Sequence, residues 1–192
     1  MRYKIMILIV ILSFAGCNQK YTPKPRGYFR IDFPAKVYHP IENRFHYRFE
    51  IPDYAAVMPD SRNPDRPDWI NIAVPASKAE IHISYYDLKS SDGHLSELME
   101  ESRQLAYKHS IKADAIDEQI FISRGNNVYG TVYKIEGNAA SPMQFFLTDS
   151  TRHFLRGALY IREVPNIDSL KPVIDFLEPD ILRLIETTTW NE

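Results

Sequence analysis

The sequence predicts an α+β fold in which an antiparallel meander sheet is covered by two helices. Three observations support this. Apolar and polar residues alternate along several short segments, two longer segments carry apolar residues at helical spacing, and short turns join consecutive strand-like segments. Strands joined by short turns pair antiparallel, and a helix with one apolar stripe buries it against another layer. The order of strands, helix, strand meander and helix is that of an α+β sandwich.

The first part of the domain is predicted to form strands. Residues 44–51 alternate between polar and apolar positions, and Pro52 ends that strand. Two more strands are expected at residues 69–74 and 80–88. The intervening residues 59–68 contain three prolines and alternating charges, so we expect a surface loop there.

Two helices and a meander complete the predicted domain. Ser91 or Asp92 is suited to cap the first helix, and Asp168 or Ser169 the last, because their side-chain oxygens accept backbone N–H bonds. The strands expected between the helices are residues 118–123, 128–136, 143–148 and 153–161. This order of elements is similar to the Mog1/PsbP-like fold, a similarity that implies no function.

Composition and charge exclude several classes of protein. The 192 residues are 44% hydrophobic and 25% charged, which indicates a folded domain with a real core. A net charge of −2 without a basic cluster argues against a nucleic-acid partner. The single cysteine excludes an intramolecular disulfide. Phosphate-loop, nucleophile-elbow and metal-ligand motifs are missing from the sequence, so we predict no catalytic residue, no metal and no cofactor.

The N-terminus predicts a lipoprotein leader. A positive start precedes the apolar run 5–12, which at ~1.5 Å per residue covers roughly 12 Å and cannot span a bilayer core of ~30 Å. The Ala-Gly pair before Cys17 resembles a bacterial lipobox, so residues 1–16 are predicted to be a signal peptide and Cys17 to be lipidated. Asn18 follows instead of Asp, which favours the outer membrane, facing the periplasm. The alternative is a secreted protein with an unmodified cysteine.

Residues 17–27 are predicted to be the lipidated cysteine and a tether, and residues 28–192 a single α+β domain. The tether is polar and contains prolines, and at ~3.1 Å per residue it reaches only about 30 Å. Partners must therefore come to the membrane surface. Arginine and aromatic residues are typical interface anchors, although the aromatic ones could equally belong to the core. The candidate contact residues are Tyr28, Phe29, Arg30, Arg62, Arg66 and Trp69.

A modification site is also a candidate. Asp149-Ser150-Thr151 matches a short bacterial O-glycosylation pattern, with Ser150 as the acceptor. A simple turn would account for the same three residues.

Several long blocks resemble one known family. The lipobox is followed by PKPRGYFRID at 23–32, YKHSIKADAI at 107–116, QFFLTDST at 144–151 and HFLRGALY at 153–160. Together they are similar to the gliding-motility lipoprotein GldD family of Bacteroidetes. The resemblance implies a cell-envelope lipoprotein needed for surface gliding and the coupled type IX secretion machinery, with a link to another lipoprotein, GldJ. No catalytic residues are attributed to that family, so it implies a non-enzymatic accessory role through protein contacts, and Cys17 alone is carried over.

Two other functions stay open on the residues alone. A hydrophobic pocket between sheet and helix would suit a periplasmic carrier of a small lipid or glycan. An envelope hydrolase would need a convergent polar cluster in a cleft.

Overall fold

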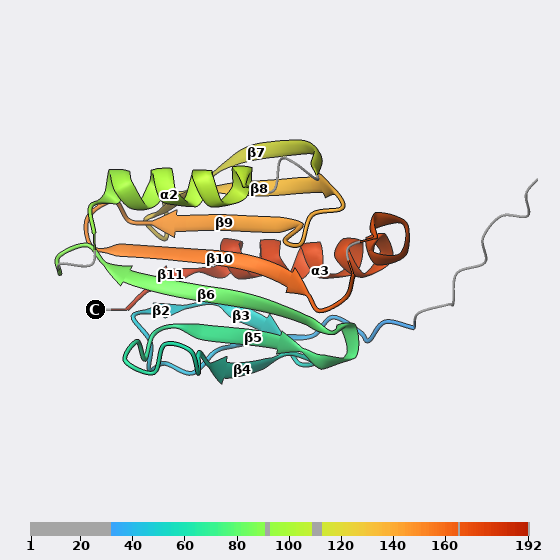
Figure 1. Ribbon diagram of the computed structural model, residues 1–192. Helices are drawn as coiled ribbons and strands as arrows, with labels where there is room; N and C mark the ends of the chain where they lie inside the picture. Colours follow the sequence, from blue (N-terminus) through green and yellow to red (C-terminus); the bar gives the residue numbers. More distant parts are fainter. Residues whose placement is uncertain (1–31, 91–92, 109–112, 165, 192) are drawn as a thin grey trace, which may run out of the picture. The chain divides into compact units, whose positions relative to one another are not determined.

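The computed structural model describes residues 32–90, 93–108, 113–164 and 166–191. Their main element is an antiparallel sheet of seven strands in the order β4-β5-β6-β10-β9-β8-β7 (Figure 1). The strands are β4 (Ala56–Pro59), β5 (Ile70–Val74), β6 (Ala79–Asp87), β7 (Ala113–Ser123), β8 (Val128–Gly137), β9 (Met143–Thr148) and β10 (His153–Ile161). The sheet and its two helices confirm the predicted α+β class.

The two helices, α2 (Leu95–Tyr107) and α3 (Ile167–Thr187), pack on opposite faces of the sheet. Successive residues of a strand point to opposite faces, and the two core clusters follow that alternation. Phe145 packs in the cluster that contains the apolar stripe of α3, whereas Phe146 packs in the cluster under α2. The sheet is therefore the middle layer of three, with the larger part of the core on the α3 side.

The segment predicted as one strand at residues 44–51 is divided between two small sheets. β2 (Tyr47–Arg48) pairs with β11 (Thr189–Trp190), and β3 (Glu50–Pro52) pairs with β1 (Tyr38–Pro40). Its alternation correctly marked a buried face, because Tyr47 and Phe49 are buried and stack on each other. The partner strands β1 and β11 have only three and two residues, which are too few for a period-two pattern.

The strands of the meander match the sequence pattern closely, whereas one helix start does not. β9 and β10 have the predicted bounds, and β7 begins five residues earlier than the predicted 118. The first residue of α3 is Ile167 and its N-cap is Asn166, so the predicted caps Asp168 and Ser169 are wrong and lie inside the helix; the side chain of Asn138 accepts the Ile167 N–H at 2.8 Å. At α2 the N-cap is His94, and the predicted caps lie outside the described residues.

A short 3-10 helix, η1 (Pro75–Ser77), turns the chain from β5 into β6. Lys78 follows it in the left-handed region with φ 48° and donates its N–H to the Pro75 carbonyl at 3.0 Å. This turn aligns Ile72 with Ile81 across the two strands, so that both contribute to the α3-side core.

Candidate functional site

The strand β7 leaves one of its backbone edges open. It pairs with β8 along Ala113–Ser123 and, in the part of the chain that the structure describes, no strand pairs with its other side (Figure 1). At 11 residues it is longer than any other described strand. An open edge presents a row of N–H and C=O groups to which another chain can add a strand.

The second half of this edge is apolar and exposed. Ile120 is 80% exposed and Ile122 is 56% exposed. Both lie on the same face of the sheet as Ile116, an even number of residues away, which packs in the cluster under α2. Phe121, between them, points to the other face and packs against the α3-side core. The strand is thus fixed from one side while its isoleucines face solvent.

Helix α2 extends this apolar area. Met99 and Tyr107 are 40% and 39% exposed, and their separation by two turns puts them on one side of the helix. The Tyr107 hydroxyl donates to Glu118 Oε1 of β7 at 2.7 Å, and this hydrogen bond is the main cause that raises the pKa of Tyr107. We name Met99, Tyr107, Ile120 and Ile122 together the β7 surface.

The opposite edge of the sheet is built differently. β4 has only four residues and ends at Pro59, which has no N–H to offer to another strand. Short strands and prolines are the usual protection of a sheet edge. The first half of β7 carries acidic residues, but Gln119–Ser123 carries neither charge nor proline. Within the described sheet, β7 is therefore the edge suited to pairing.

Of the predicted contact residues, Arg62 lies in the loop between β4 and β5, far in strand order from β7. Its side chain is 66% exposed, and Nη2 donates to His82 Nδ1 at 2.7 Å. Because the guanidinium can only donate, His82 carries its proton on Nε2. Burial is the main cause that lowers the pKa of His82, so this ring stays neutral near pH 7.

Trp69 is half-buried at the end of the same loop. Its Nε1 donates to the Tyr85 carbonyl at 2.7 Å, and the ring packs against the α3-side core. The exposed Arg66 places its guanidinium 5.8 Å from the ring centroid. Trp69 therefore anchors the loop to β6, as the core interpretation of the aromatic residues expects. The structure does not bring this loop together with the β7 surface.

Cys17, Tyr28, Phe29 and Arg30 lie outside the described residues. The modification candidate Ser150 is exposed in the turn between β9 and β10, with φ 67°. Its N–H is bonded to Thr148 Oγ1 at 2.9 Å, which leaves its hydroxyl at the tip of the turn. Glycosylation of Ser150 stays a prediction.

A buried carboxylate, Asp180 of α3, is the centre of a polar cluster on the α3 side. It accepts hydrogen bonds from Lys36 Nζ at 2.6 Å, from the Tyr38 hydroxyl at 2.7 Å and from the Tyr54 hydroxyl. Burial first, and then the bond to Asp180, raise the pKa of Tyr38 to about 12. The void beside Asp180 is about 10 Å³, enough for no substrate, so the cluster is a structural clamp. Among the described residues, no group of three or more His, Cys, Asp or Glu could hold a metal ion.

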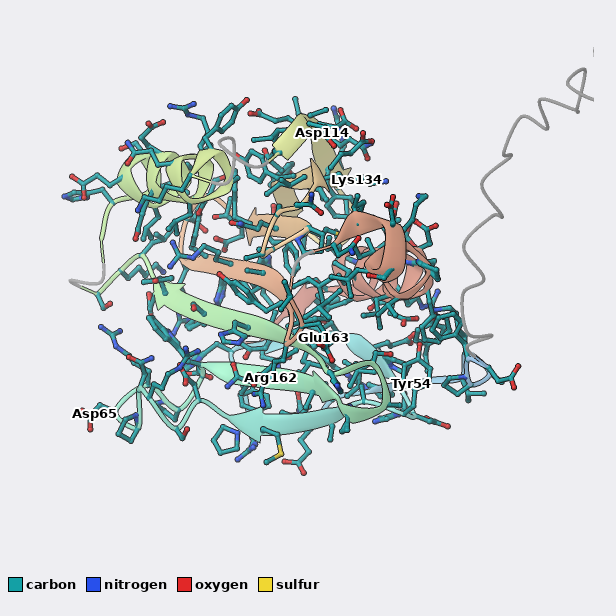
Figure 2. All side chains as sticks on the ribbon, turned by 45° about the vertical axis from the view of Figure 1, so that its right-hand side comes forward. Tyr54, Asp65, Asp114, Lys134, Arg162 and Glu163 are labelled. Atoms are coloured by element: carbon teal, nitrogen blue, oxygen red, sulfur yellow. The ribbon has the colours of Figure 1, made fainter. Side chains whose placement is uncertain are left out.

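A cleft between α3 and the β7–β9 end of the sheet tests the carrier interpretation. Its volume is about 280 Å³, slightly below the ~300–1,000 Å³ that is usual for small-molecule pockets. Asp114 and Lys134 line it (both labelled in Figure 2), and an ion pair between Lys134 and Glu178 crosses its rim. The cleft is therefore small, and its lining combines apolar side chains with charged ones.

Comparison with known proteins identifies the family. The family model described as gliding motility lipoprotein GldD matches residues 18–190, nearly the whole chain. The chain belongs to the GldD family. It is accordingly a gliding-motility-associated lipoprotein, and the family is not a known enzyme family.

Two further comparisons concern fold and curated relatives. The chain is similar to the solution structure of cyanobacterial PsbP (CyanoP) from Synechocystis sp. PCC 6803, with 11% identity and a TM-score of 0.46, over 88% of this chain and 99% of that one. No curated protein matches the chain. In the described ranges of this GldD-family chain, the structure contains no helix with the length and hydrophobicity to cross a membrane.

Proposed function

We propose that this GldD-family chain is a non-enzymatic accessory protein that stabilises a partner of the gliding and type IX secretion machinery by pairing with it through β7. Acyl chains on Cys17 hold it to the outer membrane on the periplasmic side, and its partner is another envelope lipoprotein, for which GldJ is the expected candidate. The observation that carries the proposal is the open, apolar edge at Gln119–Ser123.

Edge pairing explains why Gln119–Ser123 carries neither charge nor proline and has, among the described residues, no strand on its outer side. A flat, apolar strand edge is a site of aggregation unless a partner covers it, and the opposite edge of this sheet has the usual protection. Exposed apolar side chains beside the edge add buried area when a strand docks. The β7 surface supplies such side chains from both β7 and α2.

Charge along β7 specifies the partner strand. Asp114, Asp117 and Glu118 are exposed in its first half, and Ile120 and Ile122 in its second. The strand β7 thus offers an acidic half followed by an apolar half. An antiparallel partner strand would place apolar residues opposite the isoleucines and basic residues opposite the carboxylates, since opposite charges across strands are favourable.

Binding of this kind stabilises the partner by mass action. A complex that forms only with the folded partner lowers the fraction of unfolded, protease-sensitive partner. The short tether would keep the sheet beside the membrane, where another lipid-anchored protein is concentrated. No chemistry is required of either protein.

Photo-crosslinking in native membranes tests the contact directly. A photoreactive residue at position 120 should give one reproducible adduct, and the same residue at position 58 should not. Met58 is the matched control, because it is 51% exposed on β4 at the opposite edge of the same sheet. Equal adducts from both positions, or none from position 120, would contradict the proposal.

Charge substitution tests the consequence for the cell. The double variant Ile120→Lys with Ile122→Lys should lower partner abundance, secretion and gliding together, while Met58→Lys leaves them unchanged. The abundance of the variant lipoprotein itself, measured by immunoblot, separates loss of the contact from loss of the fold. Normal partner abundance with a stable double variant would defeat the stabilising role.

A further inference from the structure

The open edge of β7 is complementary to itself over residues 118–124. In this segment a glutamate comes first, the two exposed isoleucines stand in the middle and an arginine comes last. A two-fold axis perpendicular to the sheet pairs such an edge antiparallel with the same edge of a second copy. The axis must pass through one residue of the strand, because directly opposite residues share a face of the sheet. The residues of the edge therefore decide which of these registers is favourable.

The register centred on Phe121 matches both the apolar and the charged residues. It places Ile120 opposite Ile122 of the second copy, and the symmetry repeats this pair. It also places Glu118 opposite Arg124 of the second copy, again twice. Apolar pairs and pairs of opposite charge across two strands are both stabilising. Two apolar pairs are thus flanked by two pairs of opposite charge.

Moving the centre by one residue in either direction loses this match. A centre at Ile120 places Glu118 opposite Ile122 of the second copy, which desolvates a carboxylate against an apolar side chain. A centre at Ile122 places Ile120 opposite Arg124 of the second copy. The register centred on Phe121 is therefore preferred over its two neighbours.

Both charged residues are accessible for this contact. Arg124 is exposed in the turn that directly follows β7, and no described residue forms an ion pair with it. Glu118 is exposed on β7, and its Oε1 accepts the Tyr107 hydroxyl at 2.7 Å. That hydrogen bond leaves Oε2 for a guanidinium and orients the carboxylate from the side of α2.

We propose that β7 pairs with β7 of a second copy of this chain in the register centred on Phe121, and that the partner lipoprotein displaces this second copy. The inference rests on the proposed function, because it assigns a second occupant to the same edge. Residues 118–124 of each copy form the contact, fewer than the ~20–30 residues a side of a standard interface. The self-pairing is therefore weak. It dissociates in dilute solution and gives way to a partner that covers more of β7.

Photo-crosslinking of the purified full-length lipoprotein in detergent micelles, without other proteins, tests the self-pairing. A photoreactive residue at position 120 should give an adduct of twice the chain mass. Mass spectrometry should map the crosslink to residues 120–124 of the second copy. Position 58, on the exposed Met58 of β4, is the control for two copies that share a micelle. Absence of the double-mass adduct from position 120, a crosslink to another segment, or an equal yield from position 58 would overturn the proposal.

An exchange of charges separates the register from loss of the fold. Glu118→Arg alone and Arg124→Glu alone each place like charges opposite each other twice, so each should lower the yield of the double-mass adduct at least about fivefold. In an equimolar mixture of the two variants, the mixed dimer regains both pairs of opposite charge, so most of the yield should return. Absence of this recovery would refute the register. The self-adduct and the partner adduct of native membranes differ in mass, so either proposal can fail without the other.

Discussion

Lys36 places its Nζ 2.6 Å from Asp180 Oδ1, although the two residues are 144 positions apart. The same ammonium donates to the Phe176 carbonyl at 2.6 Å and lies 4.0 Å from the centroid of the Phe176 ring. The Phe33 ring stacks on the Phe176 ring, with 4.1 Å between the ring centroids. The start of the described chain is therefore fastened to α3 by one ion pair and one aromatic stack.

Removal of the buried carboxylate should destabilise this fastening. Asp180 is 4% exposed, so Asp180→Ala leaves Lys36 and two tyrosine hydroxyls without their common acceptor. We expect a loss of about 3 kcal/mol in the free energy of unfolding, measured in urea. Asp175→Ala breaks the exposed ion pair with Lys171 on the same helix and should lower the free energy of unfolding much less. Similar losses from both variants would mean that the Asp180 cluster contributes no more to stability than an exposed ion pair.

Local sequence patterns predict those elements whose bounds depend on neighbouring residues. Features that depend on contacts between distant residues are not predicted. The bounds of β9 and β10 follow from alternation and turn residues, both of which are readable within ten positions. The N-cap of α3 is Asn166, a residue type that caps favour, so this start was readable locally although Asp168 and Ser169 were predicted; only the bond from Ile167 N–H to Asn138, 29 residues away, has no local signal. Residues 118–123 were predicted to form a strand, but edge position depends on strand order, which the alternation does not encode.

Replacement of Gly157 by a residue with a Cβ should destabilise the protein. The ring of Phe145 lies over Gly157 in the neighbouring strand, and a Cβ added there would stand 2.1 Å from the Phe145 Cζ. Phe145 is 1% exposed and has no space to retreat, so Gly157→Ala should cost about 2 kcal/mol in urea unfolding. Gly125→Ala is the control, since a Cβ there meets nothing within 4 Å. Wild-type stability of Gly157→Ala would show that the core is loosely packed.

Stability should decrease as the pH falls from 7 towards 5. Burial is the main cause that lowers the pKa of His153, and it outweighs the nearby Asp149 carboxylate. The unfolded chain therefore binds a proton near pH 6.5 that the folded chain does not. The free energy of unfolding consequently decreases as the pH is lowered through that range. His153→Gln should flatten the curve of unfolding free energy against pH, even if its stability at pH 7 is lower. His94→Gln, at the exposed start of α2, is the control, and an unchanged slope in His153→Gln would contradict the assignment.

Hydrogen exchange should separate the two sides of the meander. Every residue of β9 is buried and the strand is paired on both sides, so its amides should exchange only through global unfolding. In β7 the amides that point away from β8 have no strand to bond to among the described residues, so peptides covering 119–123 should take up deuterium much faster. Adding the partner that photo-crosslinking identifies should slow exchange in 119–123, because a docked strand bonds those amides. The exchange rate of β4 should stay unchanged. Equal protection of β7 and β9 in the isolated protein would show that the edge is already covered.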